Sequence, residues 1–226
     1  MGALIPLTDA SRRPVNFPII TVCFIIVNFV VFGLELNGGE AFVLKWAAIP
    51  ASITASHNWI TILTAMFMHG SWSHILGNMV FLWAFGPEME DTMNPLRYLV
   101  FYLCGGLVAM LAQIVLSPSS TVPNLGASGA IAAVMGAFLV TYPGDQIRVI
   151  LVIFLFVRIK LIPAVLLIGV WFLIQLFNVG SVATVQTGGV AYAAHVGGAI
   201  FGMLFARLFV DPHRRYAHPQ ATEHPS

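Results

Sequence analysis

The sequence predicts an all-α polytopic membrane protein, with six transmembrane helices arranged as a bundle. Its composition is the first reason: 58% of the 226 residues are hydrophobic and only 8% are charged, whereas soluble domains carry roughly 25% charged residues. The second reason is the arrangement of the apolar residues, which fall into long runs separated by polar segments. Runs of this kind are typical of helices that cross a bilayer.

The apolar runs also indicate the domain organisation. A polar tail at 1–16 precedes the bundle, which we expect to occupy 17–210, and a second polar tail follows at 211–226. Inside the bundle, the interval 41–71 has the aromatic and amphipathic character of a segment that lies in the membrane interface. The six expected spans are 17–36, 72–85, 96–116, 128–142, 161–178 and 190–210.

The run at 147–159 is apolar, but we do not count it as a span. As a helix it would be about 20 Å long at 1.5 Å per residue, which is too short for a hydrocarbon core of about 30 Å. Arg148, Arg158 and Lys160 flank it or lie within it. We therefore expect this run to lie on one membrane surface.

The basic residues predict the orientation, because cytoplasmic segments carry an excess of Lys and Arg. With six spans and a cytoplasmic N-terminus, nine of the ten Lys and Arg residues lie inside and only Lys45 lies outside. Both termini are then cytoplasmic. No signal-peptide pattern is expected near the N-terminus, which favours a bacterial-type plasma membrane. The oligomeric state stays open.

Polar side chains inside spans are costly in lipid and are therefore functional candidates. We expect no Asp or Glu deep in a span. The second, fourth and sixth spans all enter from the outer side, which puts polar side chains of all three at a similar depth. The candidates in or next to the spans are Asn28, His69, His74, Asn78, Ser128, Gln175, Asn178 and His195.

Ser128 lies between Gly126 and Gly129 at the start of the fourth span. A helix over 128–142 is about 22 Å long, so its serine end should lie below the outer surface of the membrane. Small residues in the fourth and sixth spans allow these two helices to approach closely. They include Gly129, Gly198 and Gly202.

The chemistry expected of Ser128 is nucleophilic attack. A serine hydroxyl becomes a nucleophile when a neighbouring base accepts its proton, and His195 is the expected base because neutral imidazole accepts and returns protons near neutral pH. No buried carboxylate is expected to orient His195, so the sequence predicts a dyad. The oxyanion hole would combine Asn78 and His74, one helical turn apart, with Gly126 and Ser128 at the helix N-terminus.

Each of these signals has a simpler explanation on its own. Helix packing accounts for a GASG segment in a glycine-rich membrane chain, and an interhelical hydrogen bond accounts for His195, or for His74 and Asn78. A zinc site of His69, His74 and His195 is an alternative, but the chain has no HExxH segment and no carboxylate base. We therefore expect no metal and no cofactor. The net charge of +1 argues against nucleic acid as a partner.

Three segments together resemble the signatures of the rhomboid intramembrane serine proteases: HGSWSHILGN at 69–78, GASG at 126–129 and AHVGG at 194–198. They occur in the family's order, on the second, fourth and sixth expected spans. The resemblance implies a six-helix rhomboid-like bundle that cleaves single-pass membrane proteins within or beside their transmembrane helices. It also implies that Ser128 and His195 form the dyad, that the site opens to the extracytoplasmic face, and that a loop at 180–189 caps it.

The chain departs from the family pattern at two places. Four residues after the serine the family often has an aromatic residue that packs on the histidine, and this chain has Ala132. The Trp-Arg pair of the family's first loop is Trp59-Ile60 here. An inactive rhomboid-like chaperone or trafficking factor that binds transmembrane helices is the main alternative, and Ala132 favours it. A small-solute transporter is a weaker one, because the chain has no inverted repeat or buried acidic ion site.

Overall fold

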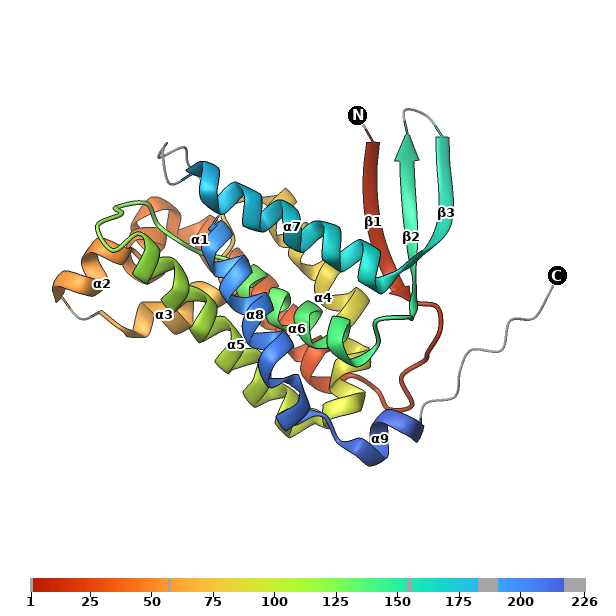
Figure 1. The fold of residues 1–226 in the computed structure, drawn as a ribbon. Helices are drawn as coiled ribbons and strands as arrows, with labels where there is room; N and C mark the ends of the chain where they lie inside the picture. Colours follow the sequence, from red (N-terminus) through yellow and green to blue (C-terminus); the bar gives the residue numbers. More distant parts are fainter. Residues whose placement is uncertain (1, 57, 154–155, 183–190, 218–226) are drawn as a thin grey trace.

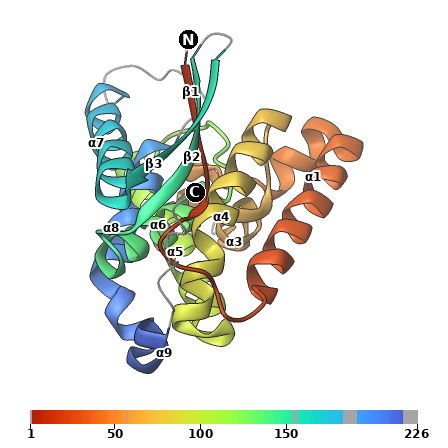
Figure 2. The same ribbon diagram turned by 90° about the vertical axis from the view of Figure 1, so that its right-hand side faces the viewer.

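A computed structural model of the protein describes residues 2–56, 58–153, 156–182 and 191–217. Helices dominate it, and a small antiparallel sheet stands beside them (Figures 1 and 2). The longer helices are α1 (Ile19–Trp46), α4 (Trp72–Met93), α5 (Pro95–Leu116), α6 (Ser128–Thr141), α7 (Ala164–Val182) and α8 (Tyr192–Phe209). The shorter helical segments are α2 (Pro50–Ser56), α3 (Ile60–Thr64), the 3₁₀ turn η1 (Ala65–Phe67) and α9 (Pro212–Ala217).

Helix α6 lies at the centre of the bundle, where it contacts α4, α5, α7 and α8. Eleven of its fourteen residues are buried. Its contact with α8 is tight: a Cβ atom added to Gly198 would collide with the Gly129 carbonyl, and one added to Gly202 would collide with the Ala133 carbonyl. Glycine at these positions lets the two backbones touch, and this contact fixes the start of α6 relative to α8.

The apolar character of the helices is that of an integral membrane protein. Helices α1, α5 and α8 are long and apolar enough to cross a membrane by length and composition. Helix α6 and the apolar part of α7, residues 164–179, are shorter. The expected count of six spans therefore rests on sequence reasoning, and three helices of the described part are both long and apolar enough to span.

Helix α1 extends beyond the expected end of the first span at residue 36. Gly39, with φ 59° and ψ −152°, interrupts it, and a second helical stretch runs on to Trp46. A positive φ of this size favours glycine, so the helix breaks three residues beyond the predicted end. Within the interval 41–71, the described residues after Trp46 form the short helical segments α2, α3 and η1.

Helix α4 is also longer than predicted. It continues through Pro87 to Met93, whereas the sequence placed its end at residue 85. The added turns are held by a buried carboxylate: Glu90 accepts hydrogen bonds from the backbone N–H groups of Ile20 and Thr21, at 2.9 and 2.8 Å. Since these N–H groups belong to the first turn of α1, the end of α4 caps that helix.

The prediction of an all-α fold is wrong in one respect, because the structure contains a three-stranded antiparallel sheet. Its strands are β1 (Gly2–Asp9), β2 (Gln146–Ile153) and β3 (Phe156–Pro163), in the order β1-β2-β3. The segment expected as a free tail, 1–16, supplies β1, and the run at 147–159 supplies most of the hairpin. Both hairpin strands are rich in Val and Ile, which favour strands, but periodicity alone does not separate a short apolar strand from a helix.

The sheet determines where the fifth span begins. Strand β1 packs against α4, and β2 and β3 contact α7, so the strands stand beside these two helices in both views (Figures 1 and 2). Helix α7 starts at Ala164, not at 161, because Leu161 and Pro163 pair with Arg148 and Gln146 in the hairpin.

Two predictions lie wholly or largely outside the described residues. Helix α7 extends to Val182, and the rest of the loop expected at 180–189 is not described. The C-terminal tail forms the short helix α9, and its remaining residues, 218–226, with His218 and His224, are likewise not described.

Candidate active site

Ser128 is the first residue of α6, and the turn before it determines its position. Gly126 has a φ of 131°, a conformation that favours glycine. Its backbone N–H donates to the Ala65 carbonyl at 2.8 Å, which ties the turn to η1. The N-cap residue, Ala127, makes no side-chain cap. The cap residue therefore offers no acceptor to the first-turn N–H groups of α6.

The side chain of Ser128 meets His195 from α8. Ser128 Oγ and His195 Nε2 are 2.8 Å apart, which is a hydrogen-bond distance. Both residues are partly exposed, although Ala127 and Gly129 beside the serine are buried. The pair thus lies at the border of the packed interior, where a substrate can approach it.

The other ring nitrogen of His195 has a partner on α7. His195 Nδ1 lies 2.8 Å from Gln175 Oε1, and Gln175 is only 8% exposed. The ring of Trp171, one turn earlier on α7, lies 5.8 Å from the His195 ring between centroids. Gln175 was among the polar candidates but had no predicted role. Its i, i+4 spacing with Trp171 puts both on one helix face, but the spacing alone does not show that this face points to His195.

Asn78 is buried on α4 and is held by a second histidine. Its side-chain Nδ2 lies 2.8 Å from His69 Nε2. The backbone N–H of His69 donates to Glu35 Oε2 at 2.8 Å. Glu35 belongs to α1 and is 5% exposed. It lies one residue before the expected end of the first span, so this carboxylate is buried in protein without lying deep in that span.

His74 lies directly beside the serine. A Cβ atom added to Gly126 would be 2.9 Å from His74 Nε2 and 3.6 Å from Ser128 Oγ, so glycine at this position leaves room for the ring. The first turn of α4 is held by its cap, because the His74 N–H donates to Ser71 Oγ at 3.2 Å. The rings of His69 and His74 meet edge to face at 5.0 Å.

The structure therefore brings three of the expected side chains, Ser128, His195 and His74, together at the N-terminal end of α6. Asn78 lies one turn further along α4. Gly126 differs from the expectation: its N–H, expected among the oxyanion donors, is already bonded to a carbonyl of η1. Its contribution is the shape of the turn and the space it leaves.

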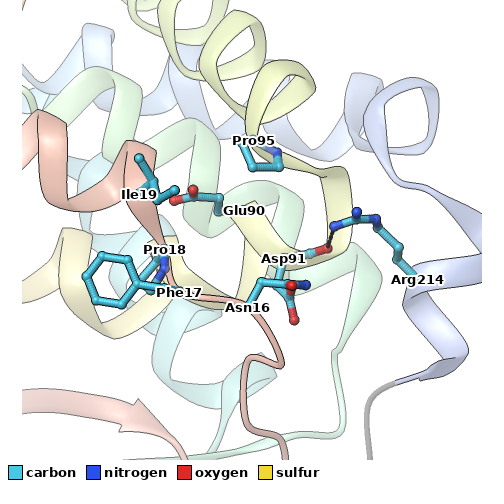
Figure 3. A pocket seen from close by; sticks show the side chains of 8 residues that line it. All are labelled: Asn16, Phe17, Pro18, Ile19, Glu90, Asp91, Pro95 and Arg214. Atoms are coloured by element: carbon cyan, nitrogen blue, oxygen red, sulfur yellow. Dashed lines mark hydrogen bonds between the residues drawn. The ribbon is translucent and has the colours of Figure 1, made fainter.

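A separate cavity of about 270 Å³ lies beside the last turns of α4 (Figure 3). Asp91 accepts hydrogen bonds there from the Val15 N–H at 2.6 Å and from Asn16 Nδ2 at 2.5 Å. Arg214 Nη1 donates to the Asp91 backbone carbonyl at 3.3 Å. These contacts join the chain before α1, α4 and α9. The residues that line the cavity include no nucleophile paired with a base, so it is a structural junction and not the candidate active site.

Comparison with known protein families matches a Rhomboid domain over residues 56–212, which is more than half of the chain. The chain belongs to the rhomboid family. The matched region contains Ser128, His195, His74 and Asn78, so these four residues all lie within the rhomboid domain.

Individual relatives agree with the family assignment. The chain is 32% identical over 136 residues to "Rhomboid protease GluP" of Bacillus subtilis, a match that covers 58% of this chain and 26% of the relative. It is 27% identical over 207 residues to "Rhomboid protein 1, mitochondrial" of Saccharomyces cerevisiae, a match that covers 88% of this chain and 55% of the relative. It is 27% identical over 150 residues to "Presenilin-associated rhomboid-like protein, mitochondrial" of Mus musculus, a match that covers 64% of this chain and 36% of the relative. The matched segments thus span between about a quarter and about half of the length of these relatives.

Proposed function

We propose that the chain is an intramembrane serine endopeptidase that hydrolyses peptide bonds within or beside the transmembrane helices of single-pass membrane proteins. The observation that carries this proposal is the 2.8 Å contact between Ser128 Oγ and His195 Nε2 in a rhomboid domain. A serine within hydrogen-bond reach of a base that is itself held by a third group is the arrangement that activates a serine nucleophile.

The proposed reaction has two halves. Ser128 Oγ attacks the scissile carbonyl carbon while His195 Nε2 takes the hydroxyl proton, and the imidazolium then gives this proton to the leaving amine. Water repeats the sequence on the acyl-enzyme: His195 takes a proton from water and returns it to Ser128 as the acyl group leaves. The substrate helix must unwind locally, because the carbonyls of an intact helix in lipid are already hydrogen-bonded.

The developing oxyanion would be stabilised from two sides. The Ser128 backbone N–H lies in the first turn of α6, at the positive end of the helix dipole. The His74 ring lies beside Ser128, and Asn78 follows on the same face of α4 at i+4. Donors held in place before the reaction stabilise the transition state without reorganisation. Gly126 supplies the space for the His74 ring.

We further propose that the bundle, 17–210, crosses a bacterial-type plasma membrane six times, with the segments 1–16 and 211–226 in the cytoplasm and the site open to the extracytoplasmic side. The Lys and Arg bias supports this orientation. A second support is that His74, Ser128 and His195 all lie in the first turn of their helices. Helices that carry them to one place must begin at the same end of the bundle.

The test is cleavage of a model single-pass substrate by the protein reconstituted in liposomes. We expect Ser128→Ala and His195→Ala to lower kcat by roughly 10³-fold or more, because each removes half of the nucleophile–base pair. Ser119→Ala makes the same chemical change at an exposed serine and should leave the rate unchanged. Full cleavage by the Ser128→Ala variant would refute the proposal.

A second measurement separates the protease from the inactive alternative. A fluorophosphonate probe should label the wild-type protein at Ser128 and leave the Ser128→Ala variant unlabelled. The alternative holds if the wild-type protein binds the transmembrane helices of other proteins but neither cleaves them nor reacts with the probe. It would then be an inactive rhomboid-like chaperone or trafficking factor.

A further inference from the structure

We propose that Gln175 is a positioning residue that fixes the tautomer and the ring orientation of His195, so that Ser128, His195 and Gln175 form one hydrogen-bonded chain. This inference rests on the proposed protease function and deepens it. Gln175 would act through His195 and not on the substrate, in the place that a carboxylate occupies in a catalytic triad.

The two ring nitrogens of His195 have different partners. Nε2 lies 2.8 Å from Ser128 Oγ, and Nδ1 lies 2.8 Å from Gln175 Oε1. An amide oxygen only accepts hydrogen bonds, so Nδ1 must carry the hydrogen in this arrangement. Nε2 is then the unprotonated nitrogen, which is the form that accepts the proton of Ser128. The amide thus selects the productive tautomer.

The surroundings of Gln175 allow its hydrogen bond with His195 to restrict the orientation of the ring. The residue is 8% exposed, so little water reaches the amide to replace the ring as its partner. Trp171, one turn earlier on α7, approaches the same ring at 5.8 Å between centroids. If the His195 ring turned about its Cβ–Cγ bond, it would lose the hydrogen bonds to Gln175 and to Ser128 together. One face of α7 therefore holds the ring.

This arrangement also accounts for Ala132. A methyl group on α6 is too small to support the imidazole, and Ala132 is fully buried. The support comes from the facing helix, through Trp171 and Gln175. An amide differs from a carboxylate in one respect: it orients the ring but carries no charge to stabilise the imidazolium. Orientation of the His195 ring and charge stabilisation of its imidazolium form are therefore separable by mutation in this protein.

The experiment is steady-state cleavage of the reconstituted substrate across pH by the wild type and by Gln175→Leu, Gln175→Asn and Gln175→Glu. Loss of one orienting hydrogen bond should lower kcat roughly 10- to 100-fold for the Leu and Asn variants. KM should stay within about twofold, because substrate contacts are unchanged. The Glu variant keeps a hydrogen-bond acceptor, so it should retain kcat. The acidic limb of its pH–rate profile should move to higher pH, because a carboxylate stabilises the imidazolium form of His195.

Gln113→Leu is the matched control. Its Oε1 is buried without a hydrogen-bond partner in the described part of the chain, so the same substitution there should leave kcat unchanged. If Gln175→Leu does not fold, the Asn variant, which shortens the side chain by one methylene, decides. Wild-type kcat in the folded Gln175 variants, with Ser128→Ala inactive, would overturn the positioning role and leave the protease assignment intact. An inactive wild type would overturn both.

Discussion

At the scale of single residues, Asn78 depends on neighbours for its orientation. Its amide is held by His69, and His69 is held through its backbone by Glu35 on α1. Two polar residues, Glu35 on α1 and His69 in the turn before α4, therefore place this side-chain amide. A buried group held in this way is arranged before the substrate arrives, which is the condition under which a donor stabilises an oxyanion effectively.

We expect Asn78→Ala to lower kcat by about 10²- to 10³-fold, the effect of removing one oxyanion donor, with a smaller change in KM. Asn28→Ala is the control, since Asn28 Nδ2 bonds within its own helix, to the Phe24 carbonyl at 2.7 Å. Steady-state cleavage in liposomes measures both variants. A folded Asn78→Ala variant with the wild-type kcat would exclude Asn78 from the oxyanion hole.

Residues whose partners follow from topology could be predicted from the sequence. Ser128, His195 and His74 lie at the first turns of helices that begin at one end of the bundle, so their convergence needed only the order of the spans. Gln175 lies twenty residues from His195 on another helix, and its contact depends on how α7 is rotated. Rotation is decided by packing against neighbouring helices, which a single sequence does not give.

At the scale of helices, the contact between α6 and α8 leaves no room for larger side chains at its glycines. Gly202 faces the Ala133 carbonyl on the central helix, and Gly198 faces the carbonyl of Gly129, the residue after Ser128. A side chain at either position would push the helices apart. The distance between Ser128 Oγ and His195 Nε2 depends on the same two helices.

We expect Gly202→Ala to destabilise the protein by about 1–3 kcal/mol, because an added methyl group overpacks the interface. Gly77→Ala, where nothing lies within 4 Å of the added Cβ, should be neutral or stabilising, since alanine favours helix. Apparent unfolding midpoints in detergent measure this difference. Equal midpoints for the two variants would contradict the tight contact between α6 and α8.

Helix starts could be predicted more reliably than helix ends or strands. α5 and α8 begin within two residues of the predicted positions, because apolar composition changes sharply there. The predicted end of α4 at 85 relied on Gly86-Pro87 and the acidic residues that follow, but Glu90 stabilises the continuation through contacts with α1, which are distant in sequence. The sheet was missed for the same reason: β1 and β2 pair across more than a hundred residues.

At the scale of the whole molecule, the sheet fastens the N-terminal segment to the corner between α6 and β2. Arg12 pairs with Asp145, and the Ala10 N–H donates to the Gln146 carbonyl at 2.7 Å. Asp9 lies in the same corner, where Oδ1 accepts from the Ser11 N–H at 2.7 Å. Burial and the neighbouring Asp145 carboxylate raise the pKa of Asp9 from its ordinary value of 3.8 to about 7.

The contribution of Asp9 to the free energy of unfolding should therefore fall as pH rises. Between pH 4 and about 7 the folded state holds the Asp9 proton while the unfolded chain has released it, so the stabilisation present below pH 4 is lost as pH rises through the folded-state pKa. Asp9→Asn should flatten this part of the profile, whereas Glu40→Gln, at an exposed site, should not. Apparent unfolding midpoints measured in detergent from pH 5 to 8 test this, and identical profiles for wild type and Asp9→Asn would contradict it.

The neutral partner of His195 has a consequence for biosynthesis. In the proposed six-span topology α7 is synthesised before α8, so Gln175 would enter the membrane before the imidazole that it contacts. A charged residue at the centre of an inserting helix costs roughly 3 kcal/mol on insertion scales, and an aspartate at this position would be exposed to lipid without its partner. The amide avoids that charge, so in this topology α7 would insert as an uncharged segment, and its hydrogen bond to His195 would form once α8 is in place.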